Sequence, residues 1–192
     1  MLILSKSCFL HAPKTGGSWV KKALIESNIE CYDFTTIDGN GHIGLKDCPC
    51  QNKFKFAFVR HPVDLYSSYW QYKMTYGWDV TNPLDMECIS YNFHQFVHNV
   101  LDKFPGAFYK NLTNFVGDVG NEIEFIGKYE NLVEDLITAL MLAGESFDEE
   151  FIRNFSPFNV SDKINYPAHY TDQLEAVVRS AESQWIARFN YL

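Results

Sequence analysis

The first residues whose types could do chemistry lie at positions 11–22, which read HAPKTGGSWVKK. A lysine, a threonine, two glycines and a serine stand between a proline and an apolar run with helical spacing. Backbone N–H groups at a helix start, together with the positive end of the helix dipole, bind anions. The stretch therefore predicts a site for an oxyanion. It departs from the Walker A loop, whose lysine follows its second glycine, because Lys14 precedes Gly16 and Gly17.

A second basic turn follows the apolar run KFKFAFVR at positions 53–60. Arg60 ends the run, Pro62 can serve as the first residue of a helix, and Ser68 lies eight residues after Arg60. If both apolar runs are strands of one parallel sheet, the turns that follow them lie at the same edge. A lysine, an arginine, hydroxyls and a helix start at one edge predict a pocket for a ligand with two anionic ends.

The elements that must position these turns alternate between strands and helices. The periodicity predicts strands over 2–10, 53–60 and 122–129, and helices from 18, from 62, over 89–104, over 132–143 and from 171. Gly144 suits a helix C-cap and Thr171 an N-cap, whereas 38–51 and 78–87 read as loops. The order predicts one domain over 1–192, a three-layer α/β/α fold with a central parallel sheet.

Composition narrows the classes of function. The chain has 192 residues, 46% of them apolar and 21% charged, which suits one globular domain. A net charge of −8 argues against a nucleic-acid partner, because phosphate binding by counterion release needs many clustered cations. We find no signal peptide or membrane span and expect a soluble, cytoplasmic protein. Five cysteines, an odd number, fit a reducing compartment.

The two anion motifs together resemble those of the sulfotransferases that use 3′-phosphoadenosine-5′-phosphosulfate (PAPS). PKTGGSW at 13–19 is similar to the family's 5′-phosphosulfate loop, and FVRHPVDLYSSYW at 58–70 to its 3′-phosphate motif. KYENLVEDL at 128–136 and the closing region 165–192 are weaker matches. The resemblance implies a P-loop NTPase-like sulfotransferase fold and PAPS as co-substrate.

The same resemblance implies roles for individual residues. Lys14 would contact the 5′-phosphosulfate and its bridging oxygen, and Arg60 with Ser68 would bind the 3′-phosphate. Ser67 is an alternative to Ser68 if the helix phase differs by one. The cofactor-binding set is then Lys14, Thr15, Gly16, Gly17, Ser18, Trp19, Arg60 and Ser68.

We expect a hydroxyl as the acceptor group and rank an amine second, and transfer of a sulfuryl group to either benefits from a general base. We expect in-line transfer without a metal, with 3′-phosphoadenosine-5′-phosphate (PAP) as product and a glycan, lipid or small molecule as acceptor. His42 in GNGHIGL ranks first as the base, because members of the family place a histidine after a glycine in this region. His11 and His61 lie inside the two anion loops and could orient neighbours.

Two further patterns raise the question of a metal. His94 and His98 lie four apart on a predicted helix, but no carboxylate or cysteine partner is evident. Cys48-Pro49-Cys50 has a narrower spacing than zinc sites prefer and would need two more ligands. We therefore expect an exposed or partly buried histidine face, free thiols and no metal.

Two other functions remain open from the sequence. One is a P-loop kinase that uses ATP and Mg²⁺, against which the position of Lys14 and the lack of an evident acidic strand end argue. The other is a nucleotide- or glycan-binding module without turnover. These motifs identify neither the acceptor nor the oligomeric state.

Overall fold

The computed structural model describes residues 1–34 and 41–191, which divide into two compact units. The first unit comprises Met1–Arg60 with Asn111–Asn159, and the second His61–Lys110 with Val160–Leu192. The expectation of a single domain over the whole chain stays a prediction. In the described part of the chain, no helix is both long and apolar enough to cross a membrane.

The first unit contains a five-stranded open sheet. Its order is β3 (Cys31–Asp33), β1 (Leu2–Leu4), β2 (Ser7–Phe9), β4 (Phe54–Val59) and β7 (Phe125–Lys128). Strands β2, β4 and β7 run parallel, with Cys8 opposite Lys55 and Ala57 opposite Ile126. Strand β1 is antiparallel to both of its neighbours. The α/β class is confirmed, but the sheet is mixed and not wholly parallel.

The difference arises at Ser5 and Lys6, where the predicted first strand divides. Both residues are exposed, and the Lys6 backbone N–H donates to the Glu145 carboxylate at 2.8 Å. A charged side chain is costly inside a sheet that is buried on both faces, so the chain turns there and β1 and β2 form a hairpin. The predicted strand over 122–129 likewise divides, into the end of β6 (Asn121–Glu122) and β7.

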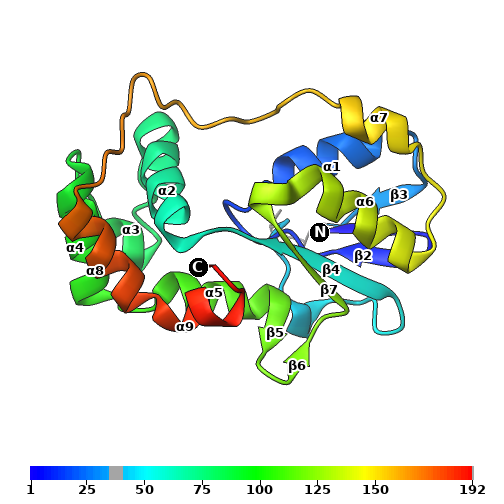
Figure 1. The fold of residues 1–192 in the computed structure, drawn as a ribbon, viewed down its shortest axis with the longest axis horizontal. Coiled ribbons are helices and arrows are strands. Elements are labelled where there is room, and N and C mark those ends of the chain that lie inside the picture. Colours follow the sequence, from blue (N-terminus) through cyan, green and yellow to red (C-terminus); the bar gives the residue numbers. More distant parts are fainter. Residues whose placement is uncertain (35–40, 192) are drawn as a thin grey trace. The chain divides into compact units, whose positions relative to one another are not determined.

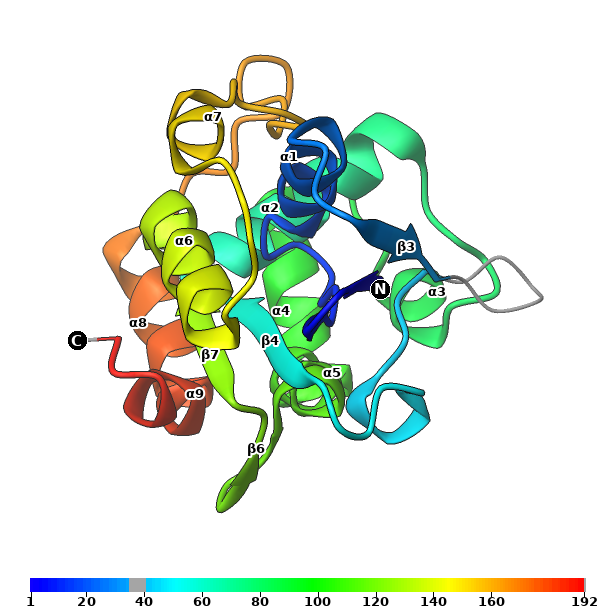
Figure 2. The same ribbon diagram turned by 90° about the vertical axis from the view of Figure 1, so that its right-hand side faces the viewer.

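One face of this sheet packs against helices α1 (Gly17–Glu26), α6 (Leu132–Ala143) and α7 (Glu149–Asn154), as Figures 1 and 2 show. The shared core includes Phe56 and Phe58 from β4, Val20 from α1 and Leu140 from α6. Helix α6 ends, as expected, at Gly144, whose φ of 70° suits glycine. Helix α7 was not predicted.

On the sheet's other side the chain is less regular. The described part of the predicted loop, 41–51, contains only the short 3₁₀ helix η1 (Leu45–Asp47), whereas 38–40 lie outside the described residues. This segment passes close to α5 (Ala107–Val116), since a Cβ added to Gly44 would lie 2.9 Å from the Asn114 carbonyl oxygen. Helix α5 leads into the hairpin of β5 (Gly117–Asp118) and β6.

The second unit is helical. It contains α2 (Pro62–Tyr76), α3 (Pro83–Cys88), α4 (Phe93–Lys103), α8 (Asp172–Ala181) and α9 (Ser183–Arg188). The start of α2 at Pro62 and the Thr171 N-cap of α8 are confirmed. The predicted loop over 78–87 is wrong at α3, because the Asn82 side chain caps a helix there and a proline at its first position is tolerated.

Candidate functional site

The parallel pairing of β2 and β4 brings two loops of the first unit to one edge of its sheet. Strand β2 leads into residues 10–16, and β4 leads into Arg60. The Arg60 Nη1 donates a hydrogen bond to the Lys14 carbonyl oxygen at 3.4 Å. The lysine loop and the arginine of the second motif are therefore neighbours within this unit.

The lysine loop has an unusual backbone. Lys14 and Gly16 both have left-handed conformations, with φ of 65° and 85°, on either side of Thr15. The buried Thr15 hydroxyl donates to the Ala12 carbonyl at 2.9 Å and so holds the loop from inside. Alternation of left- and right-handed residues turns successive N–H groups toward one side, which makes an anion-binding nest. A lysine with positive φ is uncommon, and such strained residues cluster at ligand-binding and active sites.

The start of α1 leaves its N–H groups available. Gly16 is the N-cap without a side-chain hydrogen bond, and its carbonyl already accepts from Trp19 and Val20 at 3.0 and 3.2 Å. Within the described residues, the N–H groups of 15–18 donate no hydrogen bond. The first turn of α1 also carries no acidic residue. Four donors and the helix dipole therefore remain for an anion.

Arg60 is the second cationic element of this edge. Its side chain is only 9% exposed, its Nε has no hydrogen-bond partner, and its guanidinium lies 4.0 Å from the centre of the Tyr129 ring. No carboxylate among residues 1–34 and 41–191 forms an ion pair with it. A buried cation without a counter-charge is costly, so this arrangement favours an anionic ligand.

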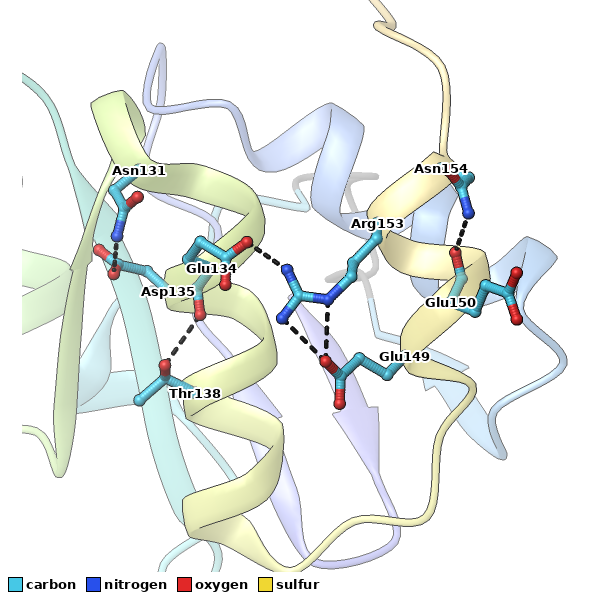
Figure 3. A network of polar contacts seen from close by, with 8 residues as sticks. All are labelled: Asn131, Glu134, Asp135, Thr138, Glu149, Glu150, Arg153 and Asn154. Carbon is cyan, nitrogen blue, oxygen red and sulfur yellow. Dashed lines mark hydrogen bonds and ion pairs between the residues drawn. The ribbon is translucent and has the colours of Figure 1, made fainter.

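Arg153 in the same unit shows the contrasting environment (Figure 3). Its side chain is 41% exposed and lies between the carboxylates of Glu134 and Glu149, with Nε 2.8 Å from Glu149 Oε1. Its charge is balanced by these two carboxylates, whereas no carboxylate of the described residues balances that of Arg60. Arg153 is therefore a matched control for Arg60.

Tyr129, which follows β7, contacts both Arg60 and the lysine loop. Besides facing Arg60, its ring lies against Gly16, where an added Cβ would be 2.9 Å from Tyr129 Cδ2 and 2.8 Å from Leu132 Cδ2. Glycine is thus required at position 16 both by its φ of 85° and by these side chains.

Two histidines of the first unit lie beside the start of α1. The His11 ring covers Gly17, where an added Cβ would lie 1.9 Å from His11 Cδ2, and it stacks on Phe9 with ring centres 5.8 Å apart. The His42 ring centre is 4.5 Å from that of His11, and His42 Nδ1 lies 2.8 Å from the His11 carbonyl oxygen. When Nδ1 donates that bond, the lone pair of the ring is at Nε2.

Both imidazoles are held neutral. Burial lowers the pKa of His11 to about 2, and the positive charges of a protonated His42, the N-terminus, Lys21 and Lys14 act in the same direction. His42 keeps solvent access, yet desolvation by its neighbours also lowers its pKa, against the opposing effect of the bond to the His11 carbonyl. A neutral ring at pH 7 can accept a proton, so His42 has the protonation state that a general base needs.

The remaining residues of the sequence motifs have other surroundings. The buried Trp19 ring donates through Nε1 to the Ser156 carbonyl at 3.0 Å and so belongs to the packing of α1. Ser68 lies in the second unit on α2, 3% exposed, with its hydroxyl 3.4 Å from that of Ser161. The Ser67 hydroxyl donates to the carbonyl of Asp64 in the same helix. The structure thus groups the lysine loop with Arg60 and His42, and places Ser68 in the other unit.

The paired histidines of the second unit serve another contact. His94 Nε2 lies 2.8 Å from the His169 carbonyl oxygen, whereas His98 is exposed. Among the described residues, no group of three potential metal ligands includes either ring.

One cluster was not predicted. Cys8, Cys48 and Cys50 of the first unit are all buried, and their sulfur atoms lie within 4.8 Å of one another. The sequence signalled Cys48-Pro49-Cys50 but offered no third ligand, because Cys8 is 40 residues away and only the fold of 41–50 against β2 brings it near.

No protein-family model matches the chain, and no curated protein matches its sequence.

Proposed function

We propose that the chain is a sulfotransferase that transfers a sulfuryl group from PAPS to a hydroxyl, with an amine as the second choice of acceptor group, of a glycan, lipid or small molecule. The observation that carries the proposal is Arg60: a guanidinium 9% exposed, without a carboxylate among the described residues, beside a lysine loop whose backbone donors are unused. Such a pair of sites suits a nucleotide with phosphate groups at two positions.

The described residues fit the anionic ends of PAPS, which when bound supplies the sulfuryl group and a stable leaving nucleotide. The N–H groups of 15–18 would hold the 5′-phosphate, and Lys14 would neutralise the bridging oxygen as negative charge develops there. Arg60 would hold the 3′-phosphate through its planar fork. The role of Ser68 at that phosphate stays a prediction from the sequence motif.

His42 would take the proton of the acceptor. Its lowered pKa keeps the ring neutral at pH 7, and the bond from Nδ1 to the His11 carbonyl places the lone pair at Nε2. The acceptor oxygen then attacks sulfur as its proton moves to Nε2, and the bond between sulfur and the bridging oxygen breaks. Lys14 would stabilise the oxygen that leaves.

A thermal-shift comparison tests the ligand class. PAP at about 100 times its dissociation constant should add about 2.7 kcal/mol, or roughly 5 to 10 °C for a chain of this length. ADP and ATP with Mg²⁺ should have smaller effects, because they lack the 3′-phosphate. A shift with ATP and Mg²⁺ alone would instead support a P-loop kinase.

Two substitutions make the comparison specific. Arg60→Ala should abolish most of the shift with PAP, whereas Arg153→Ala should keep it, because Arg153 is exposed and already paired with two carboxylates. Equal loss in both variants would remove Arg60 from the ligand site.

Turnover is a separate question from binding. His42→Gln should retain the PAP shift and lose sulfuryl transfer, measured as PAP released in the presence of a panel of hydroxyl and amine acceptors. PAP binding without transfer to any acceptor by the unmodified chain would indicate a binding module.

A further inference from the structure

Three cysteine side chains converge on the sheet of the first unit. Cys8 lies in β2, Cys48 follows η1 directly, and Cys50 comes two residues later. Their exposed fractions are 0%, 2% and 8%. All three sulfur atoms lie within 4.8 Å of one another, and the Cys8 and Cys48 sulfurs are 3.8 Å apart.

The distance between the Cys8 and Cys48 sulfurs is that of thiolates around a metal ion, and the Cys50 sulfur lies within 4.8 Å of both. Sulfurs bound tetrahedrally at the ~2.3 Å typical of zinc lie about 3.8 Å from each other. A disulfide would instead need about 2.05 Å between the sulfurs, and all five cysteines of the chain are free thiols. The geometry therefore suits metal coordination without movement of β2.

All the candidate ligands of this cluster are sulfur atoms. The Cys8 and Cys48 thiols share a hydrogen bond in which either can be the donor, and the Cys48 sulfur accepts from the Cys50 backbone N–H. The hydrogen bond to Cys48 and burial raise the pKa of the Cys8 thiol, and burial raises that of Cys50, so a metal ion would displace protons from these two thiols. Thiolates select soft ions such as Zn²⁺ and Cu⁺ and exclude Mg²⁺ and Ca²⁺.

We propose that Cys8, Cys48 and Cys50 bind one thiophilic metal ion of the Zn²⁺ class, as a structural site. Three thiolates leave the fourth position of a tetrahedral ion to a water molecule, and the burial of all three sulfurs keeps a substrate away from that position, which argues for a structural role. On binding, each thiol that is still protonated releases its proton, and the metal–sulfur bonds replace the hydrogen bonds among the thiols.

The site would fasten one segment of the first unit to another. Residues 41–50 begin with the stretch that holds His42 and end at Cys50, and β2 carries Cys8 three residues before His11. A metal ion would therefore fix the position of His42 against His11. Only this consequence for catalysis rests on the proposed sulfotransferase activity; the metal site itself does not.

The test uses the full chain, reduced and freed of metal by a chelator, and titrated with Cd²⁺ as a spectroscopic probe. One equivalent should produce the ultraviolet thiolate-to-metal charge-transfer band, and Zn²⁺ should displace it. Cys50→Ser should weaken Cd²⁺ binding at least tenfold. Cys31→Ser and Cys88→Ser should leave both band and affinity unchanged, because neither residue belongs to the cluster.

Cys50→Ser is the preferred variant because Cys50 lies in the loop before β4, whereas Cys8 is completely buried in a strand. Its metal-free circular dichroism spectrum should match that of the parent, so that lost binding reports the ligand and not the fold. No band in the unmodified chain, a band unaffected by Cys50→Ser, or a Cys8–Cys48 disulfide in place of metal binding would each overturn the proposal. A normal charge-transfer band in a chain that does not bind PAP would refute only the proposed sulfotransferase activity and leave the metal site standing.

Discussion

The guanidinium of Arg60 lies 4.0 Å from the centre of the Tyr129 ring. The two residues follow the neighbouring parallel strands β4 and β7, whose pairing continues to Val59 and Lys128. The register of β4 against β7 thus places the face of the Tyr129 ring beside the buried Arg60 guanidinium. The ring holds the guanidinium by cation–π attraction and leaves its charge available for an anion.

Replacing Tyr129 with leucine should therefore weaken PAP binding. A cation–π contact contributes about 0.5–2 kcal/mol, which corresponds to roughly a 3- to 30-fold loss of affinity in isothermal titration calorimetry. Tyr129→Phe keeps the ring and should bind PAP as the parent does. A leucine variant with parental affinity would show that Arg60 needs no aromatic support.

Gly17→Ala should destabilise the first unit, because the new Cβ would lie 1.9 Å from the His11 ring. We expect the melting temperature to fall, with a free-energy cost of about 1–3 kcal/mol from overpacking, since Gly17 is helical and has no positive φ to add to the clash. Gly120→Ala is the opposite case, a left-handed backbone with a φ of 82° and open space around it, and should cost ~1–2 kcal/mol without any clash. Combining Gly17→Ala with His11→Ala should recover much of the loss, and strict additivity would contradict the contact.

Lys14 combines a charge with a left-handed backbone, and two substitutions separate these properties. Lys14→Gly relieves the φ of 65° and should melt at or above the parental temperature, whereas Lys14→Ala keeps the strain. Both should lose sulfuryl transfer by 100-fold or more if the ammonium stabilises the leaving oxygen, on the order of ~3 kcal/mol for one such donor. Transfer that survives in either variant would assign Lys14 a purely conformational role.

His11 should make stability depend on pH. Its folded pKa of about 2 lies below the usual 6.5, so between these values the unfolded chain binds a proton that the folded chain does not. Stability is therefore complete above pH 6.5 and is lost as the pH falls, at up to ~1.4 kcal/mol per pH unit. His11→Phe keeps the ring over Gly17 and should lose about 1 to 2 kcal/mol less between pH 7 and pH 5 in denaturant titrations. Parallel curves for both proteins would mean that His11 titrates normally.

Local patterns predicted several elements well, because their signals lie within a few residues. Pro62 starts α2, Thr171 caps α8 and Gly144 ends α6 in its left-handed conformation. The pattern was less reliable where short elements compete with turns. The run over 2–10 divides at Lys6, and Asn82 with Pro83 starts a helix inside a predicted loop.

The sequence by itself determined which anion-binding groups are present: a lysine loop ahead of a helix, and an arginine after an apolar strand. Only the tertiary structure decided which groups meet. The pairing of β2 with β4 places Arg60 beside the Lys14 carbonyl, and the fold of 41–50 brings Cys48 and Cys50 to Cys8. The physical reason is that strand register and the path of a loop depend on how well the whole core is buried. The free energy of that burial depends on residues 40 or more positions apart, so no local pattern determines it.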